Sequence, residues 1–153
     1  MPGNGDVLIR CVGLNRADEL LALEEACFTS DRSKRRNLRH LLQSPTAYCL
    51  GAYHHGELVG SMVTLFKSNS RSARIHSLAV SVGVRGQGIG RRMMARAERE
   101  ARMRGCTRMR LEVRMDNLPA IRLYERLGFV DTAVISGYYD DGAHAFVMLK
   151  ELS

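Results

Sequence analysis

The sequence has no tryptophan, only 3 prolines and 6% aromatic residues, and no apolar run near the ~18 residues that a membrane-spanning helix needs. The lack of such a run argues against a transmembrane helix. The few aromatic side chains are not interleaved with basic ones, as they are in proteins that stack on nucleic-acid bases. The cysteines stand singly, without Cys-x-x-Cys or Cys/His pairing, so no metal site is expected. We expect reduced and mostly buried thiols, as in a cytoplasmic protein, at Cys11, Cys27, Cys49 and Cys106.

The length of 153 residues and the mass of 17.1 kDa fit one domain with an adequate hydrophobic core. Hydrophobic residues make up 45% of the chain, and no linker, internal repeat or low-complexity segment divides it. No charged and then apolar segment of the secretory type opens the sequence. We therefore expect a single cytoplasmic domain over residues 1–153.

A glycine-rich turn, Arg85-Gly86-Gln87-Gly88-Ile89-Gly90, separates two regular patterns. Residues 75–80 before it are typical of a strand. After it, apolar residues recur at helical spacing, namely Ile89, Met93, Ala97 and Ala101. Glycines let the backbone approach a ligand closely, and a helix N-terminus directs N–H groups and partial positive charge at an anion. The turn therefore predicts a pyrophosphate site.

Other phosphate-binding patterns differ from this turn. A dinucleotide-binding fold has Gly-x-Gly-x-x-Gly after its first strand and an acidic residue about 20 positions later. Here the spacing is Gly-x-Gly-x-Gly, and the turn lies past the middle of the chain. A P-loop needs Gly-Lys-Ser or Gly-Lys-Thr, which the sequence lacks. On this motif alone, an ordinary strand-to-helix turn stays an alternative.

The arginine-led pattern Arg85-x-x-Gly88-x-Gly90 resembles the acyl-CoA pyrophosphate loop of the GNAT acetyltransferase superfamily. Residues 111–129 resemble the other half of the same cofactor site: a strand, an Asn-bearing turn, a helix with Tyr124, and then Gly-Phe. Local signals agree, because Asp116 or Asn117 can cap that helix. With two motifs in the family's order and spacing, the sequence is identified as a member of this superfamily.

The resemblance implies the α/β GNAT fold, a mixed, mainly antiparallel seven-stranded sheet with helices on both faces. The order of the patterns along the chain, β-α-α-β-β-β-α-β-α-β-β, agrees with it. Asn15 is expected to cap the first helix, and His54-His55-Gly56 to form a hairpin. Strands are expected at 7–12, 48–54, 57–66, 74–80, 107–113, 130–136 and 144–151, and helices at 16–27, from 30 or 31 to 43, from 89 to about 105, and after Asn117.

In this fold the two central strands, here 74–80 and 107–113, splay apart, and pantetheine bonds to the backbone exposed in the gap. The resemblance therefore implies acetyl-CoA as the acetyl donor and no metal. It assigns main-chain contacts with pantetheine and the thioester carbonyl to Leu78, Ala79 and Val80. The other cofactor-binding residues that it implies are Arg85, Gly86, Gln87, Gly88, Ile89, Gly90 and Arg91 at the pyrophosphate, Asn117 at the pantetheine arm, and Ala120 and Tyr124 close by.

The net charge is +7 and the isoelectric point is about 9.7, values that often accompany binding to nucleic acid or anionic membranes. The phosphates of CoA are a sufficient explanation for a basic rim after the turn. Some of these arginines also interleave with Glu98 and Glu100, as on a solvated helix face. Direct nucleic-acid binding is disfavoured, and an RNA- or ribosome-associated binding protein stays an alternative that salt-dependent RNA binding tests. Much of the excess lies in Arg85, Arg91, Arg92, Arg96, Arg99, Arg102 and Arg104.

Within the superfamily the sequence resembles RimI-type enzymes, which acetylate protein N-terminal α-amines. It shares Leu-Glu-Val-Arg at 111–114, the segment 117–124 and a Tyr-Tyr pair before an Asp-rich turn. That resemblance makes Glu112 the general base, directly or through water, and Tyr124 the general acid. A carboxylate can take the ammonium proton, and a phenol with a pKa of ~10 can give one to a thiolate. Two alternatives stay open: Glu112 pairs with an arginine, and Tyr124 only packs on CoA.

The predicted activity is acetyl-CoA-dependent N-acetylation of a primary amine by direct attack in a ternary complex. A protein or peptide N-terminal α-amine is the expected acceptor, and lysine side chains and small-molecule amines are alternatives. A CoA-binding module without catalysis is a further alternative, against which the presence of both Glu112 and Tyr124 argues. No membrane partner is expected, and the sequence is compatible with a monomer or a homodimer.

Two loops line the acceptor groove in this fold, and they contain the predicted substrate-binding residues Phe28, Arg32, Tyr138 and Tyr139. The first loop departs from the RimI-type pattern, which typically has Pro-Trp where this chain has Phe28-Thr29. The identity of the acceptor therefore does not carry over. A basic cluster follows, which is either a solvated helix or attracts acceptors with carboxylates or phosphates near the amine: Arg32, Lys34, Arg35, Arg36 and Arg39.

Overall fold

The computed structural model describes residues 7–27 and 35–152, with every side chain in these ranges except those of residues 35–37. The expected start of the second helix lies outside the described residues. The other elements lie close to their expected limits. In chain order they are β1 (Val7–Cys11), a 3-10 turn (Leu14–Arg16), α1 (Ala17–Cys27), α2 (Arg35–Gln43), β2 (Ala47–His54), β3 (Glu57–Leu65), β4 (Ser72–Val80), a 3-10 turn (Val82–Val84), α3 (Ile89–Met103), β5 (Arg108–Arg114), α4 (Leu118–Arg126), β6 (Val130–Ile135) and β7 (Ala145–Glu151).

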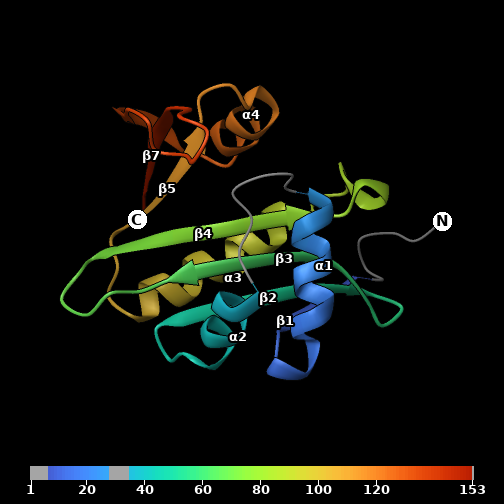
Figure 1. The fold of residues 1–153 in the computed structure, drawn as a ribbon. Helices are drawn as coiled ribbons and strands as arrows, with labels where there is room; N and C mark the ends of the chain where they lie inside the picture. The colour runs from blue at the N-terminus through green and yellow to red at the C-terminus, as the bar shows by residue number, and fades with distance from the viewer. Residues whose placement is uncertain (1–6, 28–34, 153) are drawn as a thin grey trace.

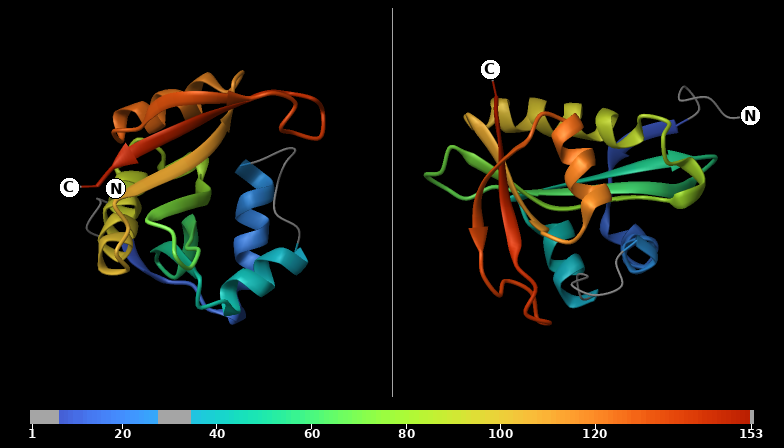
Figure 2. Two further views of the ribbon diagram at one scale, coloured as in Figure 1. Left: turned by 90° about the vertical axis from the view of Figure 1, so that its left-hand side faces the viewer. Right: turned by 90° about the horizontal axis from the view of Figure 1, so that it is seen from above.

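One seven-stranded sheet organises the fold, with the strand order β1-β2-β3-β4-β5-β7-β6. All neighbouring strands are antiparallel except β4 and β5, which are parallel. Helices α1 and α2 pack on one face of the sheet and α3 on the other, while α4 lies beside β5 and β7 (Figure 1, Figure 2). The expected mixed, mainly antiparallel seven-stranded sheet with helices on both faces is confirmed.

Local sequence signals explain most of the turns. His55 and Gly56 form the two-residue hairpin turn between β2 and β3, and both have positive φ, 50° and 80°. Two successive left-handed residues match the twist of the flanking strands. Asn117 caps α4, because its Oδ1 accepts a hydrogen bond from the Ala120 N–H at 3.2 Å. The expectation for Asn15 is wrong, since this residue lies inside the first 3-10 turn and α1 begins after it.

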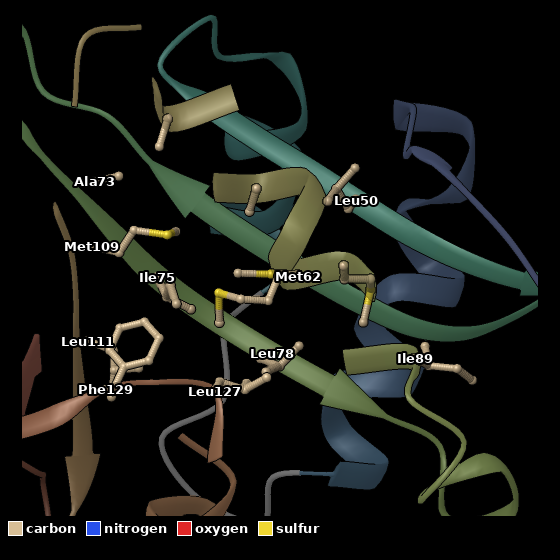
Figure 3. Packing of buried hydrophobic residues seen from close by; sticks show 14 of the residues in the cluster. Leu50, Met62, Ala73, Ile75, Leu78, Ile89, Met109, Leu111, Leu127 and Phe129 are labelled. Carbon is tan, nitrogen blue, oxygen red and sulfur yellow. The ribbon is translucent and has the colours of Figure 1, made fainter. Parts of the chain in front are cut away.

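The main hydrophobic core lies between the sheet and α3 (Figure 3). Methionines fill much of it, and Met62, Met93, Met109 and Met148 are completely buried. Their flexible, polarisable side chains adapt to the irregular space under a twisted sheet. A second cluster lies between the sheet and the other helices and contains Leu20, Leu23, Leu38, Tyr53, Leu58 and Ala79. The sheet therefore has buried apolar residues on both faces.

Several arginines of α3 bind the protein's own backbone. Arg92 Nη2 donates to the carbonyl oxygen of Val7, and Arg96 Nη1 donates to that of Ile9, both at 3.0 Å. Val7 and Ile9 belong to β1, an edge strand, so the two guanidiniums cover carbonyls of the sheet edge. Arg92 and Arg96 each use one guanidinium nitrogen for a carbonyl of β1, and the basic rim for CoA phosphates stays a prediction.

None of the helices within the described ranges is long and apolar enough to cross a membrane. The cysteines divide into two groups. Cys49 and Cys106 are buried, as expected, and burial raises the pKa of the Cys49 thiol to about 11, so it stays protonated. Cys27 is only partly buried and Cys11 is exposed, so the expectation of mostly buried thiols is correct for half of them.

Candidate active site

The strands β4 and β5 separate after a short parallel contact. Their register joins Ser72, Ala73 and Arg74 to Arg108, Met109 and Arg110, and within the described chain it goes no further. Beyond this point β4 stays paired with β3, and β5 with β7, so the two strands diverge (Figure 1). The facing edges, residues 75–80 and 111–114, carry backbone groups that an extended ligand can bond. The splay expected of the two central strands is present.

The glycine-rich turn lies at the end of β4 and opens α3. Gly86 and Gly88 have positive φ of 82° and 79°, and a Cβ atom added at Gly86 would meet no other atom within 4 Å. The first bond of the helix runs from the Arg92 N–H to the Gly88 carbonyl at 3.0 Å. Because helix starts leave N–H groups without an intrahelical partner, three donors are directed into the turn, those of Ile89, Gly90 and Arg91. The turn therefore fits a pyrophosphate.

Glu112 lies on the divergent part of β5 and accepts three hydrogen bonds. Arg74 Nε donates to its Oε1 at 2.8 Å, and Arg110 Nε donates to its Oε2 at 3.0 Å. The hydroxyl of Tyr138 donates to Oε1 at 3.0 Å and accepts from Arg74 Nη2 at 2.9 Å. The side chain of Glu112 is only 5% exposed, whereas those of both arginines are 44% exposed. The alternative that Glu112 pairs with an arginine is therefore confirmed, with two arginines.

These contacts determine the charge of Glu112. Burial alone would raise the pKa of its carboxyl group, but the hydrogen bonds from Arg74 and Arg110, the charge of Arg74 and the Tyr138 hydroxyl outweigh it and hold the pKa below 4.5. The carboxylate is therefore ionised at neutral pH. A low pKa also makes it a weaker proton acceptor than an unpaired glutamate.

Tyr124 lies on α4 and joins the main core. Its ring packs edge-on against Phe129, with the centroids 6.0 Å apart, in the cluster that also contains Leu111 and Val113. Since successive residues of a strand point to opposite faces, Tyr124 and Glu112 lie on opposite faces of β5. Burial raises the pKa of the Tyr124 phenol to about 12, so the group is protonated at neutral pH and has a proton to give.

The loop between β6 and β7 is held against β5. Tyr138 reaches Glu112, and its ring lies edge-on to that of Tyr139 with the centroids 5.0 Å apart. Arg114 of β5 lies over the Tyr139 ring, 4.8 Å from its centroid, and forms an ion pair with Asp141. Both predicted tyrosines are thus brought to the face of the sheet on which Glu112 lies.

The family model for the GNAT acetyltransferases matches residues 17–129, which covers both the glycine-rich turn and the segment from β5 through α4. The chain belongs to the GNAT acetyltransferase family. The family resemblance found in the sequence is therefore confirmed, and with it the assignment to a class of acyltransferases.

Two relatives of this chain match it over different shares of their own length. Streptothricin acetyltransferase of Streptomyces lavendulae is 37% identical over 109 residues, which is 69% of this chain but 57% of that protein. A Bacillus subtilis protein provisionally named as a ribosomal protein bS18-alanine N-acetyltransferase is 29% identical over 141 residues, 92% of each chain. The crystal structure of Ard1 from Thermoplasma volcanium superposes with a TM-score of 0.87 at 27% identity, over 97% of this chain and 99% of that one. The expected similarity to RimI-type proteins is thus confirmed.

The end of β4, where a GNAT enzyme is expected to hold pantetheine, already contains side-chain contacts. The carbonyl oxygen of Val80 accepts hydrogen bonds from Arg85 Nε at 2.9 Å and from Cys27 Sγ at 3.6 Å. A ligand that bonds to this carbonyl has to compete with Arg85 and Cys27 for the oxygen. The side chains of Leu78 and Ala79 are buried in the two cores, so these residues can offer a ligand only their main chain, and their contacts with pantetheine stay a prediction.

The structure describes only some of the remaining residues that the sequence predicts for the GNAT site. Asn117 is exposed at the start of α4 next to Ala120, and its amide oxygen is engaged by the cap. Phe28 and Arg32 lie outside the described residues, as does Lys34. Arg39 is exposed, and its Nη2 lies 3.7 Å from Oδ1 of Asp18. In residues 7–27 and 35–152, no three His, Cys, Asp or Glu side chains are grouped so that they could hold a metal ion.

Sequence reasoning missed three residues of this site: Arg74, Arg110 and His76. His76 lies where β4 has an extra residue relative to β3, and it is half-buried. Burial and then the charge of Arg74 lower its pKa below 6.5, against the opposing effect of Glu112, so the imidazole is neutral at pH 7. Arg110 and Glu112 are two residues apart in the sequence, so they lie on one face of the strand. That spacing was the signal that could have revealed Arg110 as a partner of Glu112.

Proposed function

We propose that this chain transfers the acetyl group of acetyl-CoA to a primary amine, and that the acceptor is a protein or peptide N-terminal α-amine. The observation that carries the proposal is the opening between β4 and β5, with a glycine-rich turn and a helix N-terminus at one end and an ionised carboxylate on one face. The name of the Bacillus subtilis relative, which spans 92% of both chains, supports an N-terminal acceptor.

The residues at the opening fit acetyl-CoA, which would supply an activated acetyl thioester. The N–H groups of Ile89, Gly90 and Arg91 would hold the pyrophosphate, because they belong to the first turn of α3, where N–H groups have no partner within the helix. The main chain of residues 78–80 would bond the pantetheine arm along the free edge of β4. Arg85 would then leave the Val80 carbonyl and place its charge near the phosphates.

Two proton transfers are left to the side chains. The acceptor ammonium must lose a proton, and Glu112 takes it directly or through water, helped by the negative charge that it keeps at neutral pH. His76 lies on β4, and its imidazole is neutral at pH 7. It is therefore a second group beside the opening that can accept a proton. On the other face, Tyr124 donates its phenolic proton to the departing thiolate.

The proposal is tested by incubating the protein with acetyl-CoA and a panel of amines while free thiol and acceptor mass are followed. The panel contains peptides with a free α-amine, the same peptides with a blocked N-terminus and one internal lysine, and small diamines. Thiol release with a mass gain of one acetyl group on the free α-amine is the expected result. Binding of acetyl-CoA without any transfer would instead identify a non-catalytic CoA-binding module.

A small-molecule amine is the second candidate acceptor. The observation in its favour is the 37% identity to streptothricin acetyltransferase over 69% of this chain. The same assay with streptothricin as acceptor separates the two candidates. A higher kcat/KM for streptothricin than for every peptide would replace the N-terminal α-amine as the proposed acceptor.

A further inference from the structure

The end of β4 directs backbone groups into the opening between β4 and β5. The Ser81 N–H donates to the Val59 carbonyl of β3 at 2.8 Å, so the backbone of Ser81 is directed towards β3. Successive residues of an antiparallel strand direct their N–H and C=O groups to opposite edges. The N–H and C=O groups of Val80 are therefore directed away from β3, to the edge where β4 has no paired strand beyond Arg74 among the described residues. An extended ligand in the opening can reach the Val80 carbonyl.

This carbonyl already has partners within the protein. Arg85 Nε donates to it at 2.9 Å and Cys27 Sγ at 3.6 Å, so both lone pairs of the oxygen are engaged. The two donors also contact each other, because Arg85 Nη2 donates to Cys27 Sγ at 3.9 Å. The bond from the guanidinium is the shorter one and is charge-assisted. Arg85 is therefore the stronger competitor of a ligand for this oxygen.

The charge of Arg85 favours a different position once an anion is bound nearby. Arg85 is the first residue of the glycine-rich turn, its side chain is exposed, and it pairs with no carboxylate among the described residues. Its positive charge is therefore not neutralised. A carbonyl oxygen carries only a partial negative charge, so a phosphate at the turn attracts the guanidinium more strongly than Val80 does.

We propose that the bond from Arg85 to the Val80 carbonyl is an autoinhibitory contact, and that an anion bound at the glycine-rich turn releases it. The phosphate part of CoA would in this way open the edge of β4 for the pantetheine part of the same molecule. A pantetheine fragment without phosphate has to compete with Arg85, so it binds weakly. The inference rests on the proposed use of acetyl-CoA and adds a coupling between the two parts of its site.

The first test measures the Kd of acetyl-pantetheine, a donor fragment that contains no phosphate. The Kd is obtained by NMR titration in a phosphate-free buffer without an acceptor amine, so no transfer is needed. In Arg85→Ala the Kd is expected to be about fivefold lower than in wild type, because the carbonyl has lost its stronger competitor. An arginine that serves only to bind phosphate would leave this Kd unchanged.

The second test supplies the missing anion as inorganic pyrophosphate. At saturating pyrophosphate the Kd of acetyl-pantetheine is expected to fall about fivefold in wild type and to stay unchanged in Arg85→Ala. Arg99→Ala is the matched control, because it removes an exposed positive charge from α3 outside the turn, and it keeps the wild-type response. Cys27→Ala removes the other donor to the carbonyl and also keeps the response.

Three results would overturn the inference. They are equal Kd values for acetyl-pantetheine in wild type and Arg85→Ala, no fall in the wild-type Kd with pyrophosphate, and a response that is lost in Cys27→Ala but kept in Arg85→Ala. Each leaves the proposed function intact as long as acetyl-CoA transfers its acetyl group to an amine. Absence of that transfer would refute the proposed function whatever the Kd values are.

Discussion

Arg74 and Arg110 are Cα partners in the parallel register of β4 and β5, and theirs is the last pair before the strands separate. Their side chains hold Glu112 from both sides at the apex of the opening, with bonds to different carboxylate oxygens. This relationship fixes the orientation of the carboxylate and its ionised state together. It also places two guanidinium groups beside the carboxylate that is expected to receive a proton from an ammonium ion.

Replacement of Gly88 by Val is expected to abolish stabilisation by acetyl-CoA. Gly88 has φ of 79°, a conformation that a β-branched residue adopts only with strain, and its backbone has to lie close to the pyrophosphate. The measurement is the shift in Tm on adding acetyl-CoA. The matched control is Gly83→Val, since Gly83 has open space around it and no positive φ. An equal shift in the Gly88 variant would remove the turn from the cofactor site.

Changing Glu112 to Gln is expected to reduce kcat by about a hundredfold while the affinity for acetyl-CoA changes little. The acid limb of the pH–rate profile should disappear with the carboxylate. His76→Gln is the comparison, because its imidazole lies on the same strand pair and titrates below pH 6.5. If the limb is lost in the His76 variant and kept in the Glu112 variant, His76 is the base and Glu112 only orients the acceptor.

Tyr124→Phe is expected to slow turnover by about a hundredfold with unchanged binding of CoA, because only the phenolic proton is lost and the ring still packs against Phe129. Tyr48→Phe is the control, since Tyr48 packs against the same core from β2. Pre-steady-state thiol release separates the chemical step from product release. Full activity in the Tyr124 variant would confine this residue to packing against the cofactor.

The stability of the protein should fall in acid in a way that depends on Glu112. Its pKa in the folded protein lies below the ordinary 4.5, so the folded state holds this proton less tightly than the unfolded chain. The contribution is therefore complete above about pH 4.5 and is lost as the pH falls through the folded-state value. Glu112→Gln should lose about 1 kcal/mol at pH 7 and show a shallower decline in acid, as urea unfolding at several pH values would measure. An unchanged decline would place the acid-sensitive group elsewhere.

The fold followed from the sequence because its signals are local or repeat along one element. His55 and Gly56, which have positive φ, are themselves the turn between two strands. Asn117 likewise lies directly at the start of the helix that it caps. The surroundings of Glu112 are different. Arg74 is 38 residues away, and only the parallel register of β4 and β5 brings it to the carboxylate. No periodicity within one strand contains that information.

The basic helix α3 shows a second limit of sequence reasoning. Its positive charge is evident from composition, but the direction of each long side chain depends on which strand lies below it. Arg92 and Arg96 reach Val7 and Ile9, while Arg104 donates to the Pro45 carbonyl and lies over the Phe66 ring, 4.1 Å from its centroid. A charge count could not distinguish these structural roles from contacts with phosphate.

The arginines that bind the carbonyls of β1 also restrict how copies of this protein can assemble. A strand from another molecule could add to β1 only through the backbone groups of its outer edge, and the oxygens of Val7 and Ile9 are already bonded to Arg92 and Arg96. A continuous intermolecular sheet at this edge would break two charge-assisted hydrogen bonds in each chain. The two edges of the sheet therefore differ: at β1 an added strand would compete with Arg92 and Arg96 for the backbone oxygens, and the opposite edge is β6.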